Sequence, residues 1–156
     1  MTGTFYLGAI VDDRHEVTEL LESNNHTTGP PIRFGDGPDL VVTSVSGPSS
    51  TTAPFSIAST VCNQGTQPSN GLEVRFYASA DAIISGNLES WFTSDVFLGS
   101  RFVDGLAPGQ CDSGSIDASP PPGMGAFYPG AIVNEGHWIF ELSESNNRTT
   151  GLLIRR

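Results

Sequence analysis

The chain has 156 residues, of which 15% are charged, 18 are glycine and 11 are proline, and its net charge is −10 at pH 7. Such an acidic chain has no basic patch to neutralise phosphates, which argues against nucleic-acid binding. No apolar stretch approaches the roughly 18–20 residues of a membrane-spanning helix. The charge itself is consistent either with ordinary solubility or with surroundings in which divalent cations screen the carboxylates.

Short apolar or alternating runs, separated by Gly, Pro, Asn and Asp, predict strands along the whole chain. A helix is limited to a single turn, for instance within Asp81–Ser90, because Gly or Pro interrupts every longer window with a helical period. The predicted strands are, in chain order, Thr4–Val11, Glu16–Leu21, Thr27–Arg33, Asp39–Ser46, Phe55–Asn63, Leu72–Ala78, Val96–Val103, Gln110–Ala118, Gly125–Val133, His137–Leu142 and Arg148–Ile154. Strands of this length and spacing predict an all-β fold, an immunoglobulin-like antiparallel β-sandwich.

The two ends of the chain repeat each other without a gap. Residues 3–33 align with residues 125–155 at an offset of 122, and 19 of the 31 pairs are identical. A piece this short is a hairpin and not a domain, so we predict a partial repeat, residues 1–34, followed by a full sandwich repeat, residues 35–156. The sequence leaves open which copy closes the core of the full repeat. A copy left free would be able to close the next molecule, head to tail.

The second copy is more apolar than the first at alternating positions of a predicted strand and in its last residues. It has Trp138, Phe140, Leu142, Leu152 and Leu153 where the first copy has Glu16, Thr18, Leu20, Pro30 and Pro31. Residues at i, i+2 and i+4 share one face of a strand. This face therefore either fills the core of its own domain or forms an assembly interface with another subunit or repeat. On this difference we expect the second copy to be the better donor of a hairpin to a neighbour.

Six short motifs follow one another in a recognisable order. They are Pro38-Asp39-Leu40-Val41-Val42, the segment 60–66 around Cys62-Asn63-Gln64-Gly65, Leu98-Gly99, the segment 105–110 around Ala107-Pro108-Gly109, Ala131-Ile132-Val133, and Glu141 with Glu144-Ser145-Asn146-Asn147. Together they resemble the CARDB domain, the cell-adhesion-related domain found in bacteria and archaea. The resemblance covers Pro38–Ile154, and the closing hairpin of that domain also matches residues 3–33. It implies an immunoglobulin-like sandwich, usually in tandem, in a secreted or cell-surface protein.

The two cysteines, Cys62 and Cys111, are the only ones in the chain. An even number in a surface protein favours a disulfide over two buried thiols. No histidine lies near either of them in sequence, which argues against a zinc site. By chain entropy, a bond closing a loop of this size would contribute roughly 3–4.7 kcal/mol.

Six carboxylates are candidates for a structural Ca²⁺ ion, which takes oxygen ligands. They are Asp12, Asp13, Glu19 and Glu22 in the first copy, and Asp81 and Asp95 around the connection between two central strands. The first four correspond to Asn134, Glu135, Glu141 and Glu144, so every pair keeps an oxygen-bearing side chain. Their spacing matches no established calcium loop, and the alternative is that they are solvated turn residues. No other cofactor is predicted.

No pattern for catalysis occurs in the chain. There is no Gly-x-Ser-x-Gly and no Ser–His pairing that both copies retain. The retained His15 and His137 are interpreted as turn residues, and the glycosylation sequons at Asn25 and Asn147 as part of the hairpin motif. No catalytic residue is assigned, and we predict that the chain is not an enzyme.

These observations predict a non-catalytic extracellular module with a structural or adhesive role. It would be a subunit or repeat of an adhesin or surface filament, and neighbours would assemble by a donated hairpin, as a head-to-tail homopolymer or as tandem repeats. The alternative is a module that binds carbohydrate or another surface polymer within a larger secreted protein. Grouped aromatic side chains, for instance Trp91, Phe92 and Phe97, would favour that alternative.

Overall fold

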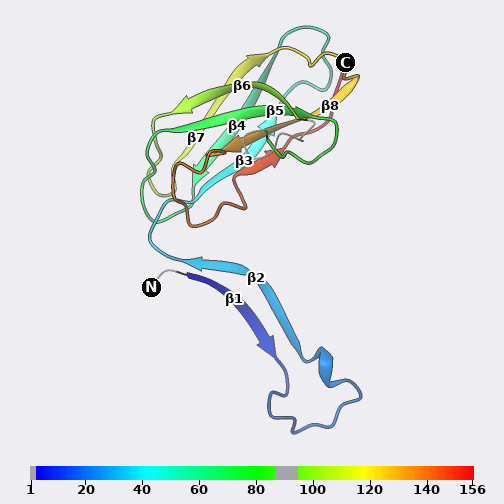
Figure 1. Cartoon of the computed structure of the whole chain (residues 1–156), viewed down its shortest axis with the longest axis vertical. Helices are drawn as coiled ribbons and strands as arrows, with labels where there is room; N and C mark the ends of the chain where they lie inside the picture. Colours follow the sequence, from blue (N-terminus) through cyan, green and yellow to red (C-terminus); the bar gives the residue numbers. More distant parts are fainter. Residues whose placement is uncertain (1–2, 87–94) are drawn as a thin grey trace. The chain divides into compact units, whose positions relative to one another are not determined.

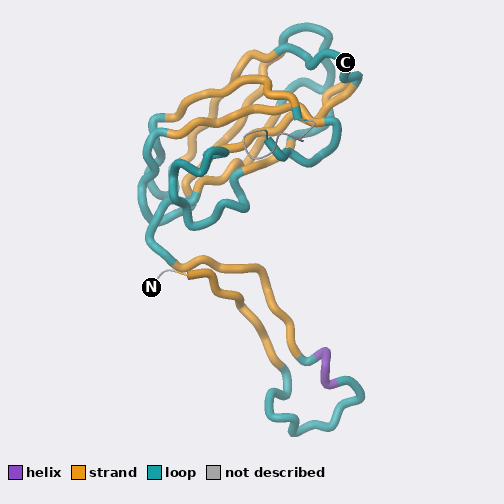
Figure 2. The backbone as a smooth tube through the Cα atoms, in the orientation of Figure 1, coloured by secondary structure: helices purple, strands orange, loops and turns teal. Residues whose placement is uncertain are grey.

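The computed structural model describes residues 3–86 and 95–156. The chain divides into two compact units, Met1–Gly35 and Asp36–Arg156, which are drawn with their strands in Figure 1. Strands and the turns that join them account for nearly all of the described structure, as Figure 2 shows. No helix of the described residues has the length and apolarity needed to cross a membrane.

The larger unit is an antiparallel β-sandwich, as predicted. One sheet has the order β3 (Leu40–Ser46), β4 (Phe55–Asn63) and β7 (Cys111–Ala118). The other sheet has the order β10 (Ile154–Arg155), β8 (Ala126–Val133), β5 (Leu72–Ser79) and β6 (Val96–Val103), and β9 (Arg148–Thr150) also pairs with β8. Alternation of apolar and polar residues decides which side chains point between the sheets.

The core lies between these two sheets. Leu40 and Ile57 from one sheet and Val74, Phe76 and Phe127 from the other are fully buried within a single apolar cluster. Burial of these apolar side chains is the main source of stability in this unit. In addition, Arg101 of β6 reaches the opposite sheet, where it forms an ion pair with Asp112 of β7.

The disulfide between Cys62 and Cys111 is present, as predicted. The two residues lie directly opposite each other in the register of β4 and β7. The bond therefore joins neighbouring strands of one sheet, next to the turn in which the backbone N–H of Gln110 donates to the carbonyl oxygen of Ala107.

The second copy of the repeat closes the sandwich of its own chain. Its strand β8 pairs with β5 over the register from Val74–Val133 to Ser79–Tyr128, and with β9 and β10 at its other edge. Phe127 and Val133 are completely buried. This result answers the question that the sequence left open, and it corrects the expectation that the second copy is the donor.

The smaller unit is a β-hairpin. Its strands β1 (Gly3–Ile10) and β2 (His26–Phe34) pair antiparallel, and a short 3₁₀ helix, η1 (Glu22–Asn24), precedes β2. Within the described residues β1 pairs with no strand other than β2. An isolated two-stranded hairpin is marginally stable at best in water.

The strands predicted at Glu16–Leu21 and His137–Leu142 are wrong, because both segments lie in loops. A left-handed backbone occurs twice at or just before the start of each segment, with φ of 51° and 52° at Asp12 and His15 and of 53° and 52° at Asn134 and His137. Such a backbone cannot continue a strand, and Asp, Asn and His tolerate it better than most residues do. The last predicted strand, Arg148–Ile154, is divided into β9 and β10. The turn expected at Asp81–Ser90 falls partly outside the described residues, and residues 81–86 are not helical.

Candidate functional site

The loop that joins the two arms of the repeated hairpin has the same hydrogen bonds in both copies. The N–H of Val11 donates to the carbonyl of Asn25 at 2.8 Å, and the N–H of Val133 donates to that of Asn147 at 2.9 Å. The two strands of the hairpin also pair in the same register in both copies, since Ala9 lies opposite Thr27 and Ala131 lies opposite Thr149. The two copies therefore have the same local structure.

Side chains at equivalent positions hold this loop. The carboxylate of Asp12 accepts the N–H of Val17 at 3.0 Å, and Oδ1 of Asn134 accepts that of Ile139 at the same distance. His15 contacts Glu22 at 3.2 Å, and its equivalent His137 contacts Glu144 at 2.9 Å. Polar side chains that bond to nearby backbone groups stabilise turns and compete with strand pairing.

In the second copy the loop also binds the beginning of β3. The carboxylate of Glu141 accepts the N–H of Leu40 at 2.5 Å on one oxygen and the side-chain amides of Asn134 and Asn147 at 2.6 and 2.7 Å on the other. Burial raises the pKa of Glu141 to about 7, although these three hydrogen bonds act in the opposite direction.

Two further contacts complete this attachment. The N–H of Leu142 donates to the carbonyl of Pro38 at 2.9 Å, and the side-chain amide of Asn146 donates to Asp39 at 2.9 Å. The side chain of Leu142 also lies against Gly37. The loop thus links the closing hairpin to the first strand of the sandwich, and we call the contacts of Glu141, Leu142 and Asn146 the β3 clasp.

The first copy has the same residues at the positions that matter for closing a sandwich. Glu19, Leu20 and Asn24 correspond to the three residues of the β3 clasp, and Leu20 is fully exposed. The buried residues Phe127, Ala131, Ile132 and Val133 correspond to Phe5, Ala9, Ile10 and Val11, which are identical in type and exposed to solvent. Residues 3–34 are therefore a closing hairpin in which the counterparts of these four buried side chains are exposed.

The five apolar residues predicted to form an assembly interface do not fill the core. Trp138, Phe140 and Leu152 are exposed, and Leu142 and Leu153 are half-buried. The residues that do fill it are those that the two copies share. A contact of these five side chains with a neighbouring subunit remains a prediction.

The carboxylates considered for calcium accept backbone N–H groups. Asp12 and Glu22 hold the hairpin loop, Asp81 accepts the N–H of Ile83 at 2.9 Å, and Asp95 accepts that of Ser85 at 2.7 Å. Asp13 and Glu19 are exposed. In the part of the chain that the structure describes, no three His, Cys, Asp or Glu side chains are grouped so that they could hold a metal ion. The residues present therefore do not provide a formed metal centre.

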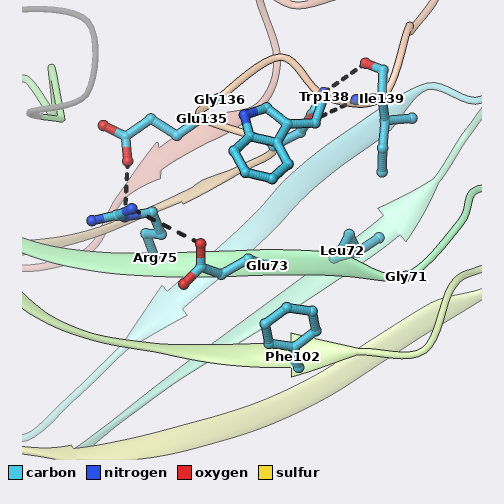
Figure 3. Close-up of a pocket in the computed structure, with 10 residues that line it drawn as sticks. Gly71, Leu72, Glu73, Arg75, Phe102, Glu135, Gly136, Trp138 and Ile139 are labelled. Atoms are coloured by element: carbon cyan, nitrogen blue, oxygen red, sulfur yellow. Dashed lines mark hydrogen bonds and ion pairs between the residues drawn. The ribbon is translucent and has the colours of Figure 1, made fainter.

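A pocket of about 460 Å³ lies on the outer face of the sheet, next to the loop of the second copy. It is lined by Gly71, Leu72, Glu73, Arg75, Phe102, Asn134, Glu135, Gly136, Trp138 and Ile139. Figure 3 shows the rings of Trp138 and Phe102 on either side of the strand segment that carries Leu72 and Glu73. Because this pocket combines aromatic and charged side chains, it is a candidate ligand site.

The charged groups of this pocket form a network. The Nε atom of Arg75 lies 3.1 Å from Oε2 of the buried Glu135, which also accepts the hydroxyl of Tyr77 at 2.5 Å. The guanidinium of Arg75 lies 4.6 Å from the centre of the Phe97 ring, a cation–π contact. Burial and the neighbouring carboxylate raise the pKa of Tyr77. Phe97 is therefore a partner of Arg75, while Trp91 and Phe92 lie outside the described residues.

Sequence reasoning missed the pocket. Arg75 and Glu135 are far apart in the chain, and only the pairing of β5 with β8 brings them together. In the sequence, Glu135 stands out only as the counterpart of Asp13 in the repeat.

Comparison with known proteins agrees with the fold. The profile of the CARDB family matches residues 37–151. The crystal structure of the CARDB domain of a Pyrococcus furiosus protein, in complex with di-metal ions, has 21% identity and a TM-score of 0.56, covering 76% of this chain and 88% of that domain. A solution structure of a domain from a Methanosarcina acetivorans protein, described as a cell surface protein, has 18% identity and a TM-score of 0.57, covering 76% of this chain and 90% of that one. Comparison with curated protein sequences gives no match.

Proposed function

The chain belongs to the CARDB family of non-catalytic, surface- and adhesion-related modules, and from this premise we propose that it is a repeat of an extracellular adhesin or surface filament in which residues 3–34 close the sandwich of a neighbouring body of the same fold. By body we mean a sandwich without its closing hairpin, which in this chain is residues 36–124. The observation that carries the proposal is the identity of the core-facing residues in the two hairpin copies. Phe5, Ala9 and Val11 are exposed, while the same residue types at positions 127, 131 and 133 belong to the core cluster of the sandwich.

The free edge of β1 supports the same interpretation. In the second copy the equivalent edge, from Tyr128 to Val133, pairs with β5. Exposed strand edges readily pair with another chain, and donation of a strand to an incomplete sheet is an established mode of assembly. A neighbouring body would supply the partner strand and also an apolar core for Phe5 and Val11.

The hairpin is too closely tethered to close its own body. If residues 3–34 took the place of the second copy, Arg33 would stand where Arg155 now stands, hydrogen-bonded to Ser49 and Thr51 beyond the end of β3. Residues 36 and 37 are held near the other end of β3 by hydrogen bonds to Thr66. A strand like β3 is about 20 Å long, whereas the three residues from 33 to 36 span at most about 11 Å. The body that residues 3–34 complete must therefore belong to another repeat or another molecule.

Removal of the second copy tests this proposal. A chain ending at residue 124 keeps the first hairpin and has a body that cannot be closed from within. We expect such chains to associate head to tail, so that the mass measured by light scattering or sedimentation rises with concentration. The full chain should stay monomeric at micromolar concentration, because its own closing hairpin is tethered at an effective concentration of the order of millimolar.

Two matched controls make the result specific. The F5A substitution in the shortened chain should weaken association, because it removes the ring that would replace Phe127 in the neighbouring core. The fragment 36–124, which has no hairpin, should not assemble. A shortened chain that is folded and strictly monomeric, or one that stays unfolded when the peptide 3–34 is added, would contradict hairpin donation.

A further inference from the structure

The exposed rings of the pocket are not explained by folding. Trp138 is 88% exposed and Phe102 is 78% exposed, although they are among the largest apolar side chains of the unit. Phe102 lies opposite Glu73 in the register of β5 and β6, so its position on the sheet is set by strand pairing. Exposed apolar groups that line one concave site usually mark a contact with a ligand or partner.

The local backbone fits the orientation of Trp138. A Cβ atom at Gly136 would lie 2.2 Å from Nε1 of the indole, so the ring occupies space that any other residue at position 136 would take. In the first copy the two positions are Arg14 and Glu16, although the rest of the loop keeps its structure. The second copy thus differs from the first by a glycine and a tryptophan that fit each other, and the indole lies over Gly136 beside the pocket.

The polar side of the pocket has more acidic than basic groups. Arg75 lies 3.1 Å from Glu135 and 3.9 Å from Glu73, so two carboxylates face one guanidinium. An anionic ligand would meet an excess of negative charge here and in the chain as a whole. A neutral ligand with hydroxyl groups would find hydrogen-bond acceptors on the half-exposed Glu73 and donors on Arg75.

We propose that this pocket binds a neutral sugar unit of a surface polysaccharide. Trp138 and Phe102 provide the apolar faces against which the C–H face of a pyranose ring packs, and Glu73 and Arg75 bind its hydroxyl groups. The volume of about 460 Å³ lies within the roughly 300–1,000 Å³ that small-molecule sites occupy. The lining comes from β5, β6 and the loop of the second copy, so the site does not include residues 3–34 and does not depend on their donation.

Titration of the full chain with soluble oligosaccharides tests the proposal. The probes are cellohexaose and chitohexaose, which are neutral, and hexagalacturonate, which is anionic. We expect at least one neutral probe to bind saturably, measured by calorimetry and by NMR shifts of the Trp138 indole N–H, and hexagalacturonate not to bind. W138A and F102A should each weaken binding by about tenfold or more, as loss of an aromatic contact residue does at other binding sites.

The matched control is F140A, which removes an exposed ring of the same loop that does not line the pocket. It should bind the neutral probe as the wild-type chain does. Three results would overturn the proposal: no binding of either neutral probe, binding that W138A leaves unchanged, or Trp138 signals that respond to the concentration of the chain and not to the sugar. The last result would identify the rings as a protein contact.

Discussion

Residues 3–34 and 125–156 share most of their sequence and the structure of their loop, but they differ in what covers them. Phe127 is 0% exposed and Phe5 is 44% exposed, although both lie three positions before the same Gly-Ala-Ile-Val run. The hydrogen bonds inside the loop are present in both copies, whereas the β3 clasp occurs in the second. The comparison shows that local residues determine the hairpin, and that the body determines whether its core face contributes to stability.

The largest difference should appear when the same ring is removed from each copy. We expect F127A to lower the free energy of unfolding by about 3–5 kcal/mol, because it leaves a cavity in the core. F5A should change it by less than about 1 kcal/mol, because that ring is partly solvated and packs edge-on against the exposed Phe34. Denaturant unfolding of the sandwich, followed by circular dichroism, measures both. Equal losses would mean that the first hairpin contributes to the core of its own chain.

The predictions from the sequence are correct where a structure depends on local residues and wrong where it depends on tertiary contacts or on an unusual backbone conformation. Strands β4 and β6 were predicted with their observed bounds, because alternating apolar residues and flanking turns are local signals. The loops at 134–147 and 12–25 were read partly as strands, because Trp138 and Phe140 alternate like core residues although they are exposed. The turn depends on left-handed backbone at Asn134 and His137, which periodicity does not reveal.

The limit of prediction from the sequence is clearer at the candidate sites. The disulfide could be predicted from the number of cysteines and the expected compartment. The identity of the closing copy could not, because both copies carry the same core-facing residues and only the reach of the chain distinguishes them. The pocket was missed for a related reason: Glu73, Phe102 and Trp138 come from three segments that meet only through the pairing of β5 with β6 and β8.

Reduction of the disulfide weakens the body and leaves both hairpins chemically unchanged. We expect the double substitution of Cys62 and Cys111 by serine to cost about 2–4 kcal/mol, since the bond restricts the unfolded chain over a separation of 49 residues. Amide hydrogen exchange should then accelerate in β8 as in β4 and β7, but not in β1. Equal acceleration in β1 would show that the first hairpin shares the stability of the body.

The β3 clasp predicts a dependence on pH. The pKa of Glu141 is raised from 4.5 to about 7, so its contribution to stability is fully present below about pH 4.5 and is lost as the pH rises through 7. Because the side chain is only partly buried and water screens it, we expect this loss to be about 1–2 kcal/mol. Unfolding of the wild-type chain and of E141Q between pH 5 and pH 8 measures it, and the wild type should lose stability relative to E141Q over that range.

The matched substitution in the first copy is E19Q, at an exposed position without a β3 strand to bind. It should change the free energy of unfolding by less than about 0.5 kcal/mol at neutral pH. If the stability difference between wild type and E141Q stays constant from pH 5 to pH 8, the carboxylate of Glu141 does not titrate in the clasp.

The smallest effect is expected from calcium, which tests whether Asp12 in the loop of the first copy differs in chemistry from its neutral counterpart Asn134. Asp12 accepts backbone N–H groups as Asn134 does, so its oxygens are already used and Ca²⁺ should not change the thermal midpoint or the hairpin amide exchange. If the hairpin had a calcium site, a free calcium concentration a hundred times its dissociation constant would instead stabilise the folded state by about 2.7 kcal/mol. Melts with calcium and with chelator distinguish the two. A stabilisation that D12N abolishes, by giving the first loop the residue of the second, would establish a cation site at Asp12.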